Sequence, residues 1–127
     1  TVQCLCDAGF YTNPNASDFL SYCLPCPGNS TSPFKSSSFD QCLCVEGYAG
    51  ANASVCAPCD IGFYSDTQGQ DECTLCPPFS TTVNTTSPTA TACECLPGYS
   101  GRNGEVCEPC PVSFYKPTVG PENCTRC

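Results

Sequence analysis

The sequence predicts a small disulfide-rich fold, mostly irregular with short β-hairpins, extended into a tandem array of small units. Sixteen of its 127 residues are cysteine, a density typical of disulfide scaffolds. There is no Met and no Trp, and Leu, Ile and Val are few. Such a chain cannot build a hydrophobic core of ordinary size, so covalent crosslinks or bound metal must make up the difference. A cysteine pattern also repeats along the chain, which indicates stacked units.

The repeat is 51 residues long and extends beyond the cysteines. Six cysteines recur at this displacement: Cys42, Cys44, Cys56, Cys59, Cys73 and Cys76 become Cys93, Cys95, Cys107, Cys110, Cys124 and Cys127. Between 42–76 and 93–127, 17 of 35 positions are identical and eleven of these are not cysteine. We therefore divide the chain into a shortened atypical repeat (1–41), a full repeat (42–92) and a truncated copy (93–127). We expect both ends to cut through a repeat of a longer mature protein.

Composition excludes several classes of function. The net charge of −8 argues against nucleic acid and anionic membrane surfaces, which bind basic patches. No stretch reaches the 18 apolar residues of a membrane span. With no His in the chain, a Ser–His or Cys–His nucleophile pair is impossible. The carboxylates are scattered, and no acidic cluster precedes a unit, so we expect no enzyme, no calcium site and no cofactor.

The spacing C-x2-C-x13-C-x2-C occurs twice, at 56–76 and 107–127, and in a cytosolic chain it would indicate zinc. The CxC pairs at 42–44 and 93–95 have no place in a four-cysteine zinc site. The CxxC pairs also lack the basic neighbours that lower a thiol pKa for redox catalysis. Structural disulfides are therefore the favoured interpretation.

Five N-x-S/T sequons point to the secretory pathway and to N-linked glycans. They begin at Asn15, Asn29, Asn52, Asn84 and Asn123. Together with the cysteine density they predict an oxidising compartment, and hence an extracellular or cell-surface protein. The Ser/Thr-rich segment 80–92 is either a solvated loop or a site for O-linked sugar.

Two motifs carry a resemblance to known modules. The segments "CLCVEGYAGANASVC" and "CECLPGYSGRNGEVC" resemble the C-terminal half of an EGF module. In that module the second cysteine of C-x-C pairs forward across a glycine-bearing hairpin. The resemblance implies the disulfides Cys44–Cys56 and Cys95–Cys107.

The segment "CDIGFYSDTQGQDECTLCPPFSTT" resembles the cysteine-rich repeats of ephrin receptors and, more loosely, of tumour-necrosis-factor receptors. Similar repeats form long arrays in surface proteins of algae and protists. The loop from Cys6 to Cys26 matches with three extra residues. The last copy departs from the pattern because Ser113 stands where the family has glycine.

The remaining cysteines allow two pairings, which the sequence leaves open. Self-closed loops, which we favour because related arrays repeat one closed loop, give Cys6–Cys23, Cys26–Cys42, Cys59–Cys73, Cys76–Cys93 and Cys110–Cys124. An EGF-like crossing gives Cys6–Cys26, Cys23–Cys42, Cys59–Cys76, Cys73–Cys93 and Cys110–Cys127. The first leaves Cys4 and Cys127 for partners outside the chain, and the second leaves Cys4 and Cys124.

Linkers of one or two residues, such as Leu43 and Glu108-Pro109, predict a stiff rod of units that touch only their neighbours. We expect a structural segment of a stalk, fibre or surface appendage whose partners are other copies or neighbouring repeats. The alternative is a receptor ectodomain that binds a protein ligand. Phe19 and Leu20, in the irregular first loop, are the candidate contact residues, with local packing as the other interpretation.

Overall fold

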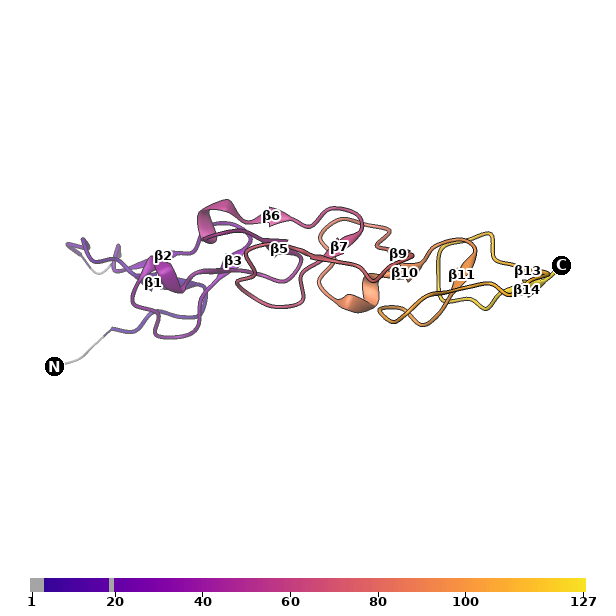
Figure 1. The fold of residues 1–127 in the computed structure, drawn as a ribbon. Coiled ribbons are helices and arrows are strands. Elements are labelled where there is room, and N and C mark those ends of the chain that lie inside the picture. The colour runs from indigo at the N-terminus through magenta and orange to yellow at the C-terminus, as the bar shows by residue number, and fades with distance from the viewer. Residues whose placement is uncertain (1–3, 19) are drawn as a thin grey trace.

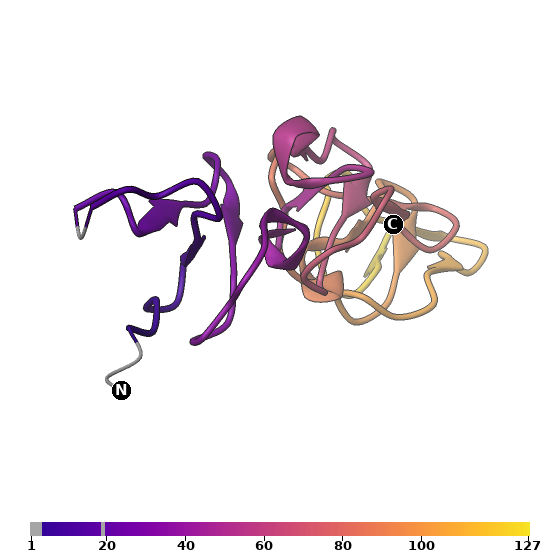
Figure 2. The same ribbon diagram turned by 90° about the vertical axis from the view of Figure 1, so that its left-hand side faces the viewer.

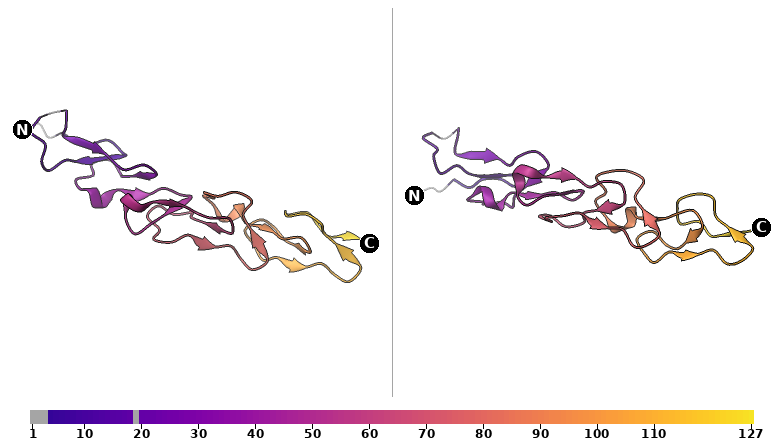
Figure 3. Two further views of the ribbon diagram at one scale, coloured as in Figure 1. Left: turned by 90° about the horizontal axis from the view of Figure 1, so that it is seen from above. Right: turned by 45° about the horizontal axis from the view of Figure 1, so that its top comes forward.

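The computed structural model describes residues 4–18 and 20–127. They form a narrow, elongated molecule with the two termini at opposite ends (Figure 1). Two further views keep this shape (Figure 3), and Figure 2 looks along the long axis. The accessible surface is 7880 Å², against about 6,500 Å² for a compact protein of the same mass. No helix among the described residues is long and apolar enough to cross a membrane. The predicted small disulfide-rich fold with short β-hairpins is confirmed.

Five hairpins share one local design. Their antiparallel strand pairs are β1 (Phe10–Thr12) with β2 (Cys23–Pro25), β5 (Tyr48–Ala49) with β6 (Ala57–Pro58), β7 (Phe63–Tyr64) with β8 (Thr74–Leu75), β11 (Tyr99–Ser100) with β12 (Glu108–Pro109), and β13 (Phe114–Tyr115) with β14 (Thr125–Arg126). Each first strand begins at the aromatic residue of the motif Cys-x-x-Gly-Phe/Tyr, with Ser in place of Gly in the last hairpin. The EGF-like and ephrin-receptor-like segments are therefore built on the same hairpin.

The turn before each hairpin explains the glycine in the motif. The N–H of Phe10 donates to the carbonyl of Asp7 at 3.1 Å, and Gly9 between them has φ +87°. A four-residue turn with positive φ at its third residue is typical of type II, which favours glycine there. The carbonyl of Gly9 then accepts the N–H of Cys26 at 2.8 Å, which closes the hairpin.

Two further sheets join the disulfide loops to the hairpins. They are β3 (Ser30–Thr31) with β4 (Leu43–Cys44), and β9 (Ser80–Thr81) with β10 (Glu94–Cys95). Short 3-10 helices lie between paired strands: η1 (Phe39–Gln41) between β3 and β4, η2 (Ala53–Val55) between β5 and β6, and η3 (Ala90–Ala92) between β9 and β10. The residues expected to be linkers, Leu43 and Glu108-Pro109 among them, are thus paired strands.

The sequence period does not coincide with the edges of the structural units. Strands β3 and β4 pair residues on the two sides of the boundary drawn between 41 and 42. The disulfide Cys26–Cys42 crosses the same boundary. Periodicity gives the length of a repeat, but any starting point gives the same period.

The core consists of cystines and small residues. The buried apolar residues are Cys6, Cys42, Cys44, Ala49, Ala53, Cys59, Cys76, Cys93, Cys95 and Cys107. Larger aliphatic side chains lie outside, with Leu20 92% and Val112 94% exposed. Hydrophobic burial is therefore small, and seven loops closed by disulfides, each contributing about 3 kcal/mol in the chain-entropy model, carry most of the stability.

Backbone hydrogen bonds connect each unit to the next. Gly47 N–H donates to the carbonyl of Ser65, and Gly98 N–H to that of Lys116, both at 2.8 Å. Aromatic contacts add to this, with Tyr11 edge-on to Phe39 at 5.7 Å and Phe79 stacked on Tyr99 at 4.3 Å. Consecutive hairpins and loops are therefore held by hydrogen bonds and aromatic contacts as well as by the continuous chain, which restricts bending between them.

Candidate functional site

The structure has the self-closed pairing of cysteines. Its seven disulfides are Cys6–Cys23, Cys26–Cys42, Cys44–Cys56, Cys59–Cys73, Cys76–Cys93, Cys95–Cys107 and Cys110–Cys124. The Cα–Cα distances lie between 5.5 and 5.8 Å, within the usual range. The two pairs that the EGF resemblance implied are both present, whereas the EGF-like crossing is not the arrangement in the structure. Cys4 and Cys127 are unpaired and exposed.

The pairing uses the sulfur atoms that a zinc site would need. Among residues 4–18 and 20–127, no group of three or more His, Cys, Asp or Glu side chains could hold a metal ion. In the first copy of the zinc-like spacing Cys59 bonds Cys73, while Cys56 and Cys76 bond cysteines elsewhere. In the second copy Cys110 bonds Cys124, Cys107 bonds Cys95, and Cys127 is unpaired. Apart from Cys127, the cysteines of both copies form crosslinks.

All five sequon asparagines lie on the surface. They are Asn15, Asn29, Asn52, Asn84 and Asn123. Asn52 also caps η2, because its Oδ1 accepts the N–H of Ser54 at 2.9 Å. Asn29 has a left-handed backbone, with φ +66°. Exposure makes each asparagine sterically open to a sugar.

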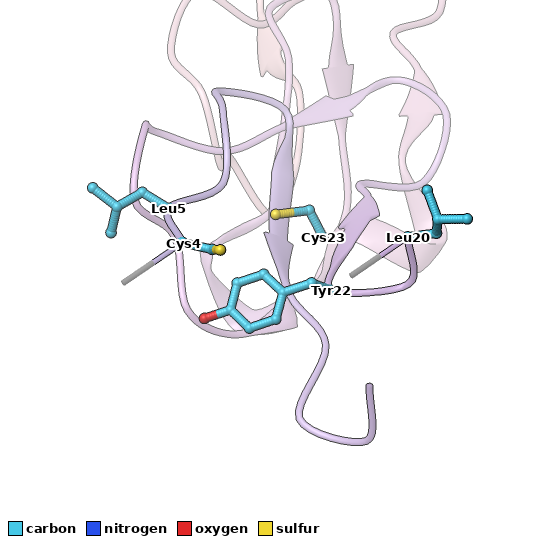
Figure 4. Close-up of a pocket in the computed structure, with 5 residues that line it drawn as sticks. All are labelled: Cys4, Leu5, Leu20, Tyr22 and Cys23. Carbon is cyan, nitrogen blue, oxygen red and sulfur yellow. The ribbon is translucent and has the colours of Figure 1, made fainter. Parts of the chain in front are cut away.

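The first hairpin is the irregular part of the array, and it carries an apolar hollow of about 380 Å³. The hollow is lined by Cys4, Leu5, Leu20, Tyr22 and Cys23. Figure 4 shows the Tyr22 ring extending below Cys4, with Leu20 on the opposite side of the hollow. The candidate contact residue Leu20 therefore borders the hollow, whereas Phe19 lies outside the described residues. Leu20 and Tyr22 come from the Cys6–Cys23 loop, which spans 17 residues, against 14 in Cys59–Cys73.

Polar contacts close the longer loop. Asn13 Nδ2 donates to the carbonyl of Ser21 at 2.9 Å. Asp18 Oδ1 accepts from both the hydroxyl and the N–H of Ser21, at 2.7 and 2.8 Å. These hydrogen bonds hold the pKa of the Asp18 carboxyl below its usual value near 3.8, because they favour its ionised form. The insertion is thus a shaped turn that presents Leu20 to solvent.

The sequence did not predict one contact between the Cys76–Cys93 loop and the hairpin β11–β12, in which the Phe79 ring stacks on Tyr99. Aligning Pro27-Gly28-Asn29-Ser30-Thr31 with Pro77-Pro78-Phe79-Ser80-Thr81 would have marked Phe79 as the aromatic exception to this pattern. That alignment has an offset of 50 residues, so it is hidden in the 51-residue register of the cysteines.

Comparison with known proteins fits this geometry. Residues 47–93 match the family model described as "Tyrosine-protein kinase ephrin type A/B receptor-like". The chain carries cysteine-rich, ephrin-receptor-like repeats. The matched span holds the two hairpins β5–β6 and β7–β8 with the loop that follows them, so the family motif coincides with the structural unit seen here.

Three relatives show where such repeats occur. The chain is 40% identical over 92 residues to the mouse protein "Sushi, von Willebrand factor type A, EGF and pentraxin domain-containing protein 1", covering 67% of this chain and 3% of that protein. It is 36% identical over 110 residues to "Cysteine repeat modular protein A" of Toxoplasma gondii, covering 75% and 4%. It is 30% identical over 88 residues to human "Ephrin type-A receptor 8", covering 68% and 7%.

The chain therefore spans only a few per cent of the length of these relatives. It consists of cysteine-rich extracellular modules of the kind present in surface proteins and receptors. Its disulfides suit the secretory pathway, in agreement with the predicted extracellular or cell-surface location.

Proposed function

We propose that the chain is a non-enzymatic structural segment, a stiff rod in a stalk, fibre or surface appendage of a secreted or cell-surface glycoprotein. The observation that carries this proposal is the recurring hydrogen bond between consecutive hairpins. Gly47 to Ser65 and Gly98 to Lys116 make the same hydrogen bond 51 residues apart. A spacer needs this property, because each added unit must extend the rod without adding a hinge.

Small-angle X-ray scattering of the oxidised chain tests the rod. We expect a radius of gyration well above the roughly 14 Å of a compact domain of this length, with a constant cross-section. Deleting residues 42–92 joins Gln41 to Cys93, the equivalent of Cys42, and removes one full period. A rod becomes shorter by one repeat and keeps its cross-section. A compact particle, or a broad distribution of lengths, would contradict the proposal.

The neighbouring repeats and other copies of the protein are the proposed partners. The exposed side chain of Leu20 beside the hollow of the first hairpin favours a contact there between two copies. We expect Leu20→Ala to weaken self-association in analytical ultracentrifugation. Leu75→Ala is the matched control, because Leu75 is also exposed, at 67%, but lies on a regular hairpin. Unchanged association in Leu20→Ala excludes this contact.

A receptor module that binds a protein ligand is the second candidate. The same hollow favours it, because binding sites are concave and mostly apolar and occupy upwards of about 300 Å³. The deletion of residues 42–92 separates the two functions. If the chain is a spacer, the deletion shortens the distance between the parts of the protein on its two sides. If the first hairpin is a receptor site, its affinity for the ligand is the same with and without residues 42–92.

A further inference from the structure

The two loops that link hairpins begin with the same turn. Asn29 and Phe79 have φ +66° and +64°. The carbonyl of Asn29 accepts the N–H of Val45 at 3.0 Å, and the carbonyl of Phe79 accepts the N–H of Leu96 at 2.9 Å. In both turns the following serine hydroxyl donates to the proline carbonyl at 2.6 Å. Asn29 and Phe79 are therefore structurally equivalent, and their side chains leave the backbone in the same direction.

The side chain of Phe79 lies on a tyrosine of the next hairpin. Its ring stacks on that of Tyr99, with centroids 4.3 Å apart and an interplanar angle of 6°. Tyr48 is the equivalent tyrosine one repeat earlier. The preceding glycines, Gly47 and Gly98, have φ +87° and +86°, and both tyrosines donate their N–H to the residue three positions earlier at 3.1 Å.

Tyr48 thus takes the position of Tyr99, and Asn29 takes the position of Phe79. In the part of the chain that the structure describes, no aromatic ring stacks on Tyr48. Asn29 is exposed, and its side-chain amide makes no hydrogen bond to the described residues. It also begins the sequon Asn29-Ser30-Thr31. One junction thus has a phenylalanine stacked on its tyrosine, and the other has a glycosylation acceptor at the position of that phenylalanine.

We propose that Asn29 carries an N-linked glycan whose first N-acetylglucosamine packs against the Tyr48 ring, in the place that Phe79 occupies on Tyr99. A pyranose has a face of C–H groups that can lie on an aromatic ring, whose face is electron-rich. The sugar is joined to the side-chain amide nitrogen of Asn29, so its ring starts farther from the backbone than a phenylalanine ring does and extends over the phenol ring of Tyr48. The glycan is then a structural part of the first junction, as the phenylalanine is of the second.

The attachment chemistry uses the secretory pathway's donor, an oligosaccharide linked to a lipid pyrophosphate. The amide nitrogen of Asn29 forms a bond to C1 of the N-acetylglucosamine. The bond from C1 to the pyrophosphate oxygen breaks, the lipid pyrophosphate leaves with its electron pair, and the amide loses one proton to a base of the transferase. No electrons are exchanged with an oxidant or reductant, and the product is the neutral glycosylamide.

The other sequons provide contrasts within the same chain. The Oδ1 atom of Asn52 is bonded to the N–H of Ser54. Asn84 is exposed and lies in the Cys76–Cys93 loop, away from the turn that precedes the tyrosine. A sugar on Asn84 has no equivalent aromatic position, so Asn84 is the matched control for Asn29.

The test expresses the full chain through the secretory pathway and trims its glycans enzymatically to single N-acetylglucosamines. Peptide mass spectrometry is expected to find the sugar on Asn29. NMR is expected to show upfield ring-current shifts and nuclear Overhauser effects between this sugar and the Tyr48 ring. Both signals disappear in Tyr48→Ala, while any sugar on Asn84 is unaffected.

Hydrogen exchange provides a second readout. The amide of Val45, which donates to the Asn29 carbonyl, is expected to exchange about threefold to tenfold more slowly in the glycosylated chain than in Asn29→Gln, the effect of one aromatic contact. The sugar-free variant Asn29→Phe, which copies the second junction, is expected to recover this protection. An unmodified Asn29 in the secreted chain overturns the proposal. So does a sugar whose signals are the same with and without the Tyr48 ring.

Discussion

Residues 59–76 and 110–127 follow the same backbone path but fill one buried position with different chemistry. In the first segment the position is Ser65, which is fully buried, and its hydroxyl donates to Gln70 Oε1 at 3.2 Å. The same Oε1 accepts the N–H groups of Asp66 and Thr67, each at 3.1 Å. A short side chain and a neutral amide thus satisfy the interior of this hairpin loop.

In the second segment Lys116 occupies the place of Ser65, and it is only 4% exposed. Its Nζ donates to the carbonyls of Thr118, Cys95 and Leu96, at 2.8, 3.2 and 3.5 Å. Pro121 replaces Gln70 and offers no side-chain donor or acceptor. The comparison teaches that cystines and turns determine the backbone, while the buried polar group can change as long as the backbone N–H and carbonyl groups around it keep hydrogen-bond partners.

The largest expected effect removes what the two segments share. Reducing the disulfides is expected to unfold both, because seven loops at about 3 kcal/mol each amount to roughly 20 kcal/mol, more than the few exposed aromatics supply. Hydrogen exchange by mass spectrometry measures this as loss of protection throughout the chain. Protection that survives in either segment after complete reduction and alkylation would contradict the assignment of stability to the cystines.

The pairing itself can be checked on the oxidised chain by chymotryptic mass mapping. Cleavage after Leu75 separates Cys73 from Cys76. The self-closed pairing leaves the peptide of Cys59 bonded to the peptide that ends at Leu75. An EGF-like crossing instead leaves Cys59 bonded to the peptide of Cys76.

The next largest effect is expected from the second glycine of the Gly-Tyr-x-Gly motif. A Cβ at Gly101 would collide with the carbonyl oxygen of Val106 and come within 3.3 Å of Cys95 Sγ. Val106 cannot retreat, because Cys107 beside it is bonded to Cys95. We expect Gly101→Ala to destabilise this hairpin by about 3 kcal/mol, measured as faster reduction of Cys95–Cys107.

The first glycine of the motif is the control for this clash. A Cβ at Gly98 has no neighbour within 4 Å, so Gly98→Ala adds only the strain of φ +86°, about 1 kcal/mol. Gly50→Ala should reproduce the clash in the other copy, against the carbonyl of Val55. If Gly98→Ala is as damaging as Gly101→Ala, backbone conformation rather than close approach governs both positions.

Lys116→Ala breaks the comparison at the position where the two segments differ. It removes the Nζ donor from three carbonyls, and buried carbonyls without donors cost about 1–3 kcal/mol each. The carbonyl of Cys95 keeps the N–H of Gly120 at 3.0 Å, and that of Leu96 keeps the N–H of Tyr99 at 3.1 Å. Only the carbonyl of Thr118 loses its donor, so we expect a total of about 2 kcal/mol. The measurement is faster hydrogen exchange at the Gly98 N–H, which donates to the Lys116 carbonyl.

Transplanting the other solution sharpens the same test. Lys116→Ser with Pro121→Gln copies Ser65 and Gln70 into the last hairpin. It should restore most of the protection that Lys116→Ala loses. Ser65→Ala should cost less, about 1 kcal/mol, because one hydroxyl is removed while Gln70 keeps its other contacts. A double variant no better than Lys116→Ala would show that the two segments differ in backbone as well.

The sequence predicted the class of fold because cysteine spacing and the scarcity of aliphatic residues can be read without knowing which residues are in contact. The strand character of Leu43 could not be predicted, since a two-residue strand shows no alternation. Burial of Lys116 was equally hidden, because lysine is almost always exposed and its partners are backbone carbonyls. The equivalence of Asn29 with Phe79 depends on an offset of 50 residues, which the 51-residue period of the cysteines conceals and the shared turn geometry makes plain.

The smallest expected effect tests the departure from glycine at Ser113. This residue has φ +72°, while Gly62, its counterpart, has φ +94°. A non-glycine residue is strained in this region, so Ser113→Gly is expected to stabilise the last hairpin by about 1 kcal/mol. Gly62→Ser is the reciprocal change, and a Cβ there meets Thr81 Oγ1 only at 3.7 Å, so strain without collision is expected. Hydrogen exchange at the Phe114 and Phe63 amides, which close the two turns at 3.0 Å, measures both. Equal and opposite shifts would show that the two hairpins differ here by backbone strain alone, whereas a destabilised Ser113→Gly would mean that the serine side chain makes a compensating contribution.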